Sequence, residues 1–152
     1  MPVQKNRFGN GRVVYIPEIK PSVPKPSTLA MTSRYWKLPV NWKELIESVQ
    51  WASGNNLSLD IEAPLSVAME LTRKKDKSAL ILHLINFDQK TLFVQNIKVD
   101  ILVPEGKKVT QVAVLTPDGR ADDILRFKEN GKRIAFTVPR LYVYDVVVIK
   151  LD

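Results

Sequence analysis

The chain has 152 residues, 45% of them hydrophobic and 26% charged, which is the composition of a globular domain and not of a disordered segment. It contains no cysteine, which excludes disulfides, thiolate metal sites and cysteine nucleophiles. No run of 18 apolar residues occurs, so we expect no transmembrane helix. The first residues show no apolar segment of the signal-peptide kind, and the compartment stays open.

The formal net charge is +7, and the positive residues form short clusters beside predicted turns. These clusters are Arg73 to Lys77, Lys107-Lys108 and Lys132-Arg133. Lysines of this kind keep strand edges soluble. Nucleic-acid binding usually adds a recognisable motif, or exposed aromatic residues among the basic ones, and the sequence has neither. We therefore expect neither a nucleic acid nor a membrane as partner.

Residues 1–56 differ in character from the rest of the chain. Gly9-Asn10-Gly11 predicts a turn, and the run from Gly11 to Pro17 predicts one β-strand. No neighbouring strand is evident, so this strand is expected to be an orphan that needs a sheet from elsewhere. Prolines at positions 17, 21, 24, 26 and 39 predict an extended, semi-rigid linker.

A single short helix is predicted over residues 42–53. Asn41 is a favourable N-cap, and Glu44 three residues later predicts a capping box. Gly54 is placed to end the helix. One apolar stripe has helical spacing and must pack on something; it consists of Trp42, Leu45, Ile46 and Val49.

Residues 57–152 predict a separate domain of about eight short strands and no helix. Short strands with regular turn signals are typical of an antiparallel β-sandwich, here expected to be immunoglobulin-like. Asn130-Gly131 predicts a type I′ hairpin turn, because both central residues of that turn need positive φ. The last run, 141–151, is apolar on both faces, which predicts a central strand. The strands are expected at 57–61, 67–72, 79–86, 93–103, 109–115, 124–128, 133–138 and 141–151.

No group of side chains predicts catalysis. His83 is the only histidine, and one histidine cannot build a zinc site without other nitrogen or sulfur ligands. Alternation places it on one face with Ile81 and Ile85, where we expect a hydrogen bond to the backbone or a neighbour. We therefore expect no cofactor and no metal, and this chain is not expected to be an enzyme.

Three acidic residues could be either catalytic or structural. Asp60 and Glu62 lie two apart on one predicted strand, near enough for a glycosidase carboxylate pair, but their place at a strand end favours solvated carboxylates. Asp145 lies between apolar residues in the middle of a strand. If it is buried, it needs a partner, and a Lys or Arg of a neighbouring strand is expected.

Sugar binding without catalysis needs exposed aromatic faces beside polar groups. All three tryptophans, Trp36, Trp42 and Trp51, precede the predicted sandwich. Tyr35, Trp36 and Trp51 are the candidate carbohydrate-binding residues. The alternative is that these rings fix the linker and the helix onto the sandwich.

Several segments together resemble one family of enzymes. The run Gly9 to Pro17 resembles the strand that ends the amidotransferase-like domain of β-galactosidase-like glycosidases, which serves there in trimer formation. Later segments resemble the small C-terminal β-sandwich of the same proteins: Glu62 to Pro64, His83 to Phe87, Asn96 to Val99, Val138-Pro139 and Val143 to Ile149. The catalytic barrel and its two carboxylates have no counterpart, so no catalytic residue is carried over.

The resemblance implies that residues 1–56 are the remnant of a preceding amidotransferase-like domain and that residues 57–152 are the sandwich. The chain is then expected to be a non-catalytic, C-terminal accessory domain of a glycoside hydrolase. Its expected partners are the catalytic domain of the same parent protein, and a second copy in a homo-oligomer. The alternative function is a carbohydrate-binding β-sandwich module.

Overall fold

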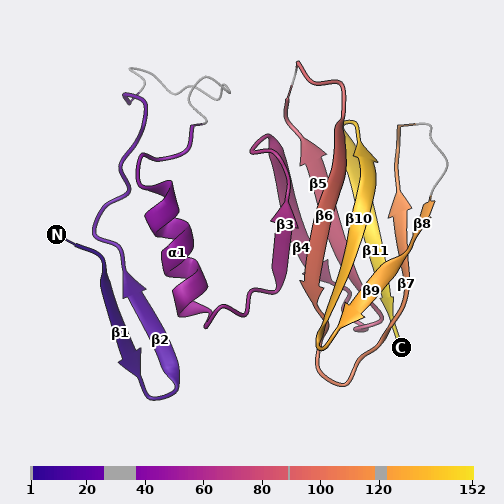
Figure 1. Cartoon of the computed structure of the whole chain (residues 1–152), viewed down its shortest axis with the longest axis horizontal. Coiled ribbons are helices and arrows are strands. Elements are labelled where there is room, and N and C mark those ends of the chain that lie inside the picture. The colour runs from indigo at the N-terminus through magenta and orange to yellow at the C-terminus, as the bar shows by residue number, and fades with distance from the viewer. Residues whose placement is uncertain (1, 26–36, 89, 119–122) are drawn as a thin grey trace. The chain divides into compact units, whose positions relative to one another are not determined.

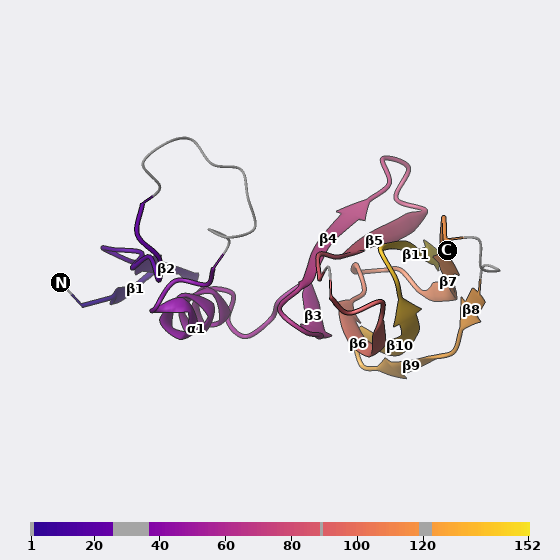
Figure 2. The ribbon, with the colours of Figure 1, turned by 90° about the horizontal axis from the view of Figure 1, so that it is seen from above.

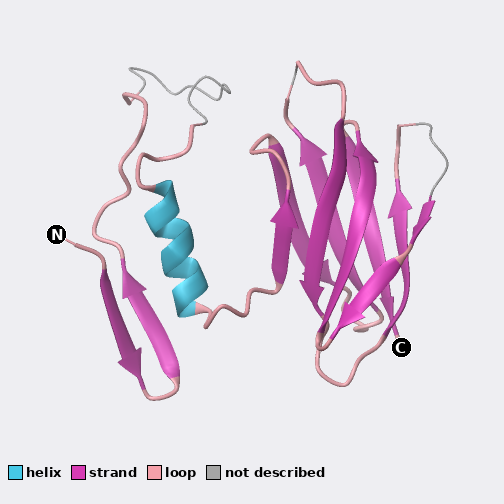
Figure 3. Ribbon diagram, in the orientation of Figure 1, coloured by secondary structure: helices cyan, strands magenta, loops and turns pink. Residues whose placement is uncertain are grey.

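The computed structural model describes residues 2–25, 37–88, 90–118 and 123–152. The chain divides into two compact units, Met1–Leu57 and Ser58–Asp152. The described part of the first unit contains a hairpin and a helix, and that of the second contains strands joined by turns (Figure 3).

The hairpin of the first unit consists of β1 (Gln4–Phe8) and β2 (Gly11–Tyr15). The prediction of an orphan strand is therefore wrong, because β1 pairs with β2 along its whole length. The predicted turn is confirmed: Gly9 has a φ of +57° between the paired residues Phe8 and Gly11. The sequence did not predict β1, because all five of its side chains are exposed and no apolar alternation marks the strand.

Helix α1 (Trp42–Ala52) packs against β2. The predicted capping box is wrong, because Asn41 makes no side-chain cap. Its Oδ1 instead accepts a hydrogen bond from the Lys20 backbone N–H (3.0 Å), and its Nδ2 donates to the Glu18 carbonyl (3.0 Å). Gly54, with a φ of +68°, follows the C-cap as predicted.

The second unit is a sandwich of two antiparallel sheets, which confirms the predicted fold class. One sheet has the order β3-β6-β10-β9 and the other β4-β5-β11-β7-β8. Figure 1 labels the strands in a view in which the two sheets overlap, and Figure 2 shows the two sheets as separate layers. The strands are β3 (Leu59–Glu62), β4 (Val67–Arg73), β5 (Ala79–Asn86), β6 (Val94–Leu102), β7 (Val109–Leu115), β8 (Asp123–Leu125), β9 (Phe127–Asn130), β10 (Arg133–Leu141) and β11 (Tyr144–Leu151).

The run 124–128, which was predicted as a single strand, belongs to two strands, β8 and β9. The chain leaves one sheet and joins the other at Arg126: β8 pairs with β7, whereas β9 pairs with β10. The sandwich therefore has nine strands among its described residues, where about eight were expected. A change of sheet requires a bend that the apolar pattern of the run does not reveal.

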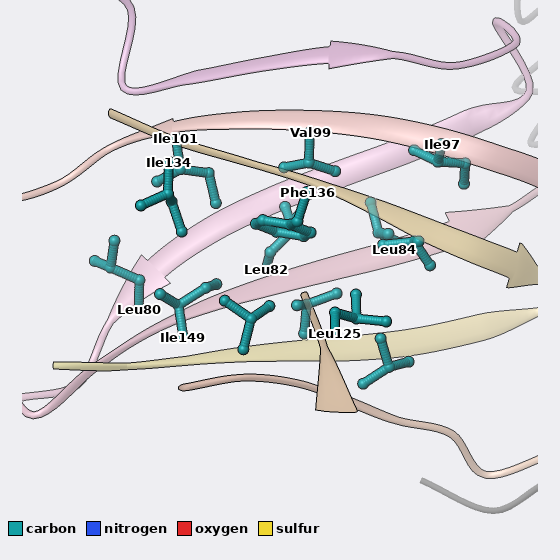
Figure 4. Close-up of a cluster of buried hydrophobic side chains, with 14 of the residues drawn as sticks. Leu80, Leu82, Leu84, Ile97, Val99, Ile101, Leu125, Ile134, Phe136 and Ile149 are labelled. Atoms are coloured by element: carbon teal, nitrogen blue, oxygen red, sulfur yellow. The ribbon is translucent and has the colours of Figure 1, made fainter. Parts of the chain in front are cut away.

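The core lies between the two sheets and is built by the inward side chains of alternate positions (Figure 4). Each fully buried Leu or Ile contributes about 1.5–3 kcal/mol to folding. Alternation breaks at Asn96, which has a φ of +55°, so that both Val94 and Ile97 point inward. The fully buried aliphatic residues include Leu82, Leu84, Ile97, Ile101, Val112, Val138, Leu141, Val147 and Ile149.

Strand β11 lies at the centre of the five-stranded sheet, as predicted. The hairpin between β9 and β10 is also confirmed, but its turn is displaced by one residue. Asn130 pairs with Arg133, so that Gly131 and Lys132 form the loop, and of these two only Gly131 has positive φ (+60°). The type I′ assignment is therefore wrong, because that turn needs positive φ at both central residues.

Candidate functional site

The candidate sugar-binding residues can be placed only in part. Tyr35 and Trp36 lie outside the described residues. The ring of Trp51 is half-buried, with the Lys5 ammonium 5.8 Å and the Arg12 guanidinium 5.4 Å from its centroid. Arg12 also donates a hydrogen bond to the Trp51 carbonyl (3.0 Å). These cation–π contacts hold the helix to the hairpin of the first unit.

The structure brings His83 and Tyr144 together on neighbouring strands. The His83 Nδ1 and the Tyr144 hydroxyl are 2.7 Å apart, and the two rings are stacked with an interplanar angle of 14°. The predicted hydrogen bond of His83 to a neighbour is thus confirmed. Asp145, next in the chain, is fully buried, as its apolar surroundings suggested.

The outer surface of the five-stranded sheet carries apolar side chains in adjacent rows. Val148 of β11 lies between Ile81 of β5 and Ala113 of β7, and Ala113 pairs in turn with Ile124 of β8. In the next row, Val146 lies between His83 and Leu115. We call this surface the apolar face; its large aliphatic residues are Ile81, Ile85, Leu115, Ile124, Val146 and Val148.

These side chains are not part of the core. Ile81, Ile85, Val146 and Val148 are half-buried, and Ile124 is 67% exposed. Leu115 is also exposed, and contiguous exposed apolar patches are typical of interaction sites. The apolar face is therefore a contiguous and partly exposed apolar patch.

The outer surface of the four-stranded sheet has the opposite character. One row across it runs from Asp60 through Asp100 and Ala135 to Lys128, and the adjacent row joins Glu62, Lys98 and Thr137. These residues line an open groove of about 850 Å³, which we call the polar groove. Ala135 lies between Asp100 and Lys128 in the first row, and its methyl group is shorter than the side chains of both neighbours. The lining residues of the groove also include Arg126 and Phe127.

Charges within the polar groove are balanced. Three carboxylates (Asp60, Glu62, Asp100) and three cations (Lys98, Arg126, Lys128) line it. Lys98 forms an ion pair with Glu62 (2.9 Å), and Arg133 beside the groove is paired with Asp100. Asp60, Arg126, Lys128 and Thr137 are exposed, and no hydrogen bond joins their side chains to the described part of the chain.

No cluster of three or more metal-ligating side chains occurs in the described ranges. No helix in them is both long and apolar enough to cross a membrane. Sequence reasoning noticed Asp60 and Glu62 but missed the groove, because its other walls come from strands far apart in the chain. The charged residues that alternate along β6, Lys98 and Asp100, were the available signal.

No protein-family model and no curated protein sequence matches this chain. Among solved structures, it is similar to an α-L-fucosidase isoenzyme 2 from Paenibacillus thiaminolyticus, with a TM-score of 0.61 and 19% identity over 73% of this chain. It also matches a cycloisomaltooligosaccharide glucanotransferase of a Paenibacillus species, complexed with cycloisomaltoheptaose, with a TM-score of 0.47 and 16% identity over 77% of this chain. The chain spans 18% and 23% of those two chains. At this identity, the likeness to the fucosidase shows a shared fold.

Proposed function

We propose that this chain is a non-catalytic accessory domain of a glycoside-hydrolase-like protein, in which the apolar face packs on a neighbouring domain or subunit. The observation that carries the proposal is the apolar face itself. Six large aliphatic side chains lie on one outer sheet surface, outside the core that folds the sandwich. Inter-domain interfaces are built from surfaces of this kind.

The glycosidase context of the proposal has two supports. This chain is similar in fold to a part of the α-L-fucosidase and spans 18% of that chain, so a fold of this kind occurs within a longer glycosidase. The resemblance of Gly9 to Pro17, and of the later segments, to β-galactosidase-like enzymes points independently to the same class of parent. Fold alone does not give function, so the contact surface has to be tested directly.

The test replaces apolar side chains of the apolar face by polar ones of similar shape. The triple variant Ile85→Thr, Val146→Thr and Val148→Thr keeps β-branched residues in the strands. In the isolated chain, it should lower dye binding to exposed apolar surface. In the full-length gene product, it should loosen the contact of the sandwich, measured as faster proteolytic release of this domain.

A matched control is Val143→Thr, because Val143 is 62% exposed in the turn before β11 and lies off the apolar face. It should leave proteolytic release unchanged. Unchanged release in the triple variant, with the variant folded, would refute the apolar face as the contact surface.

A further inference from the structure

We infer that the polar groove is a binding site for a neutral, polyhydroxylated ligand, and specifically for a stretch of an oligosaccharide chain. The inference rests on the proposed function for the choice of carbohydrate among such ligands. It moves the sugar-binding role from the aromatic residues of the first unit to hydrogen-bonding side chains of the sandwich, namely Asp60, Lys98, Asp100, Lys128 and Thr137. It thereby departs from the expectation that sugar binding needs an exposed aromatic face, because Phe136 of the lining is part of the core and Phe127 packs against it.

Size and shape support a ligand of this class. The groove measures about 850 Å³, and ligand sites typically span about 300–1,000 Å³. It is open to solvent, and its lining spans all four strands of the sheet, so an extended ligand can lie across the strands. The single methyl group of Ala135 leaves room for a sugar ring on the floor of the groove.

The hydrogen-bonding groups suit hydroxyl groups better than a charged ligand. A hydroxyl both donates and accepts, so successive hydroxyl groups along one sugar chain can donate to a carboxylate such as Asp60 and accept from an ammonium such as Lys128, which lie on opposite edge strands of the sheet. These two residues lie in the same row across the sheet. The three carboxylates and three cations of the lining cancel, and Arg133 beside the groove adds one positive charge that is paired with Asp100, so the groove attracts a phosphate or sulfate group only weakly.

The remaining charge pattern points the same way. The chain carries a net charge of +7, yet the polar groove contributes nothing to it. Asp60 lies directly opposite Asp100, and Arg133 forms an ion pair with Asp100 but not with Asp60. Carboxylates held without an ion-pair partner, as Asp60 is among the described residues, are acceptors ready for sugar hydroxyls.

The experiment is affinity electrophoresis of the full chain in gels that contain barley β-glucan, arabinoxylan, galactomannan, dextran or amylopectin, with a heparin gel as the anionic arm. Ala135→Arg fills the floor of the groove, and Asp60→Asn removes the carboxylate with little change of shape. Glu70→Gln is the matched control, an equivalent change of an exposed carboxylate on the other sheet. Circular dichroism shows whether each variant is folded, and Asp60→Asn alone suffices should Ala135→Arg fail to fold.

We expect the unmutated chain to be retarded on at least one neutral polysaccharide. Ala135→Arg should abolish the retardation, Asp60→Asn should weaken the affinity about tenfold, and Glu70→Gln should leave it unchanged. Three results would overturn the inference: no retardation on any neutral gel, retardation that the groove variants leave unchanged, or retardation on heparin alone. None of them bears on the apolar face, which is tested without sugar, so the accessory-domain proposal can fail or stand separately.

Discussion

Asp60 of β3 and Asp100 of β6 lie directly opposite each other in the antiparallel register, so two carboxylates face each other across neighbouring strands. Arg133 forms an ion pair with Asp100 and donates to its backbone carbonyl (3.2 Å). Asp60 gains no such partner from the described residues. The sheet therefore keeps an unfavourable pair at the edge of the polar groove.

Removal of this repulsion should stabilise the isolated sandwich. We predict that Asp60→Asn raises the free energy of unfolding by about 0.2–1 kcal/mol, because like charges directly opposite each other destabilise a sheet by that order. Urea denaturation measures the change. Glu62→Gln is the control: it loses an exposed ion pair with Lys98 and should destabilise by no more than about 1 kcal/mol. A destabilising Asp60→Asn would show that the carboxylate contributes to folding.

The position of the core can be tested by the same mutation at a buried and at an exposed leucine. Leu82 is fully buried between the sheets, whereas Leu92 is 74% exposed. Leu82→Ala should lower the free energy of unfolding by about 2–5 kcal/mol, because it leaves a cavity among packed side chains. Leu92→Ala should change it by less than about 0.5 kcal/mol. Equal effects of the two mutations would contradict the position of the core.

The turn between β4 and β5 should contain an unusually acidic carboxyl group. The Ser78 hydroxyl (2.7 Å) and backbone N–H (3.0 Å) donate to Asp76, and Lys74 forms an ion pair with it. These contacts lower the pKa of Asp76 from 3.8 to about 2. Carboxyl NMR titration should find this value, and Ser78→Ala should raise it towards 3.8. A titration of the unmutated chain near 3.8 would contradict the turn geometry.

The same shift fixes the sign of a pH effect. Because the folded-state pKa of Asp76 is lower than its ordinary value, its contribution to stability is present above pH 3.8 and is lost as the pH falls through about 2. In Asp76→Asn, this part of the acid dependence should disappear.

Ser48 gives a prediction for the first unit. It is 2% exposed in the middle of α1, and its hydroxyl has no hydrogen-bond partner in the described structure. We predict that Ser48→Ala stabilises the unit by about 1 kcal/mol, since a buried hydroxyl without a partner is costly and alanine favours helix. Tryptophan fluorescence during thermal unfolding reports this unit, because all three tryptophans belong to it. Gln50→Ala, an exposed change in α1, is the control, and a destabilising Ser48→Ala would show that the hydroxyl is bonded.

The sandwich was predictable where local patterns decide the structure. Strands β5 and β7 have the expected bounds, because their apolar alternation ends at clear turn signals. The sequence did not reveal where alternation breaks, at Asn96, or where the chain changes sheets, at Arg126. Both features depend on tertiary pairing and not on the residues of one strand.

Both outer surfaces of the sandwich were harder to predict than its core. A half-buried Val148 and a buried Val147 are the same residue type in the sequence, and pairing alone tells which of them faces outward. The polar groove combines residues of β3, β6, β9 and β10, so no local motif could announce it. The immunoglobulin-like type of the sandwich and the amidotransferase-like origin of residues 1–56 stay predictions.

The size of the native gene product tests the central claim most directly. An immunoblot of source cells, with an antibody raised against this chain, measures it. The accessory-domain account predicts a band several times larger than the 17.3 kDa of this chain. A single band at 17.3 kDa would contradict that account, because the chain would then act without a catalytic parent.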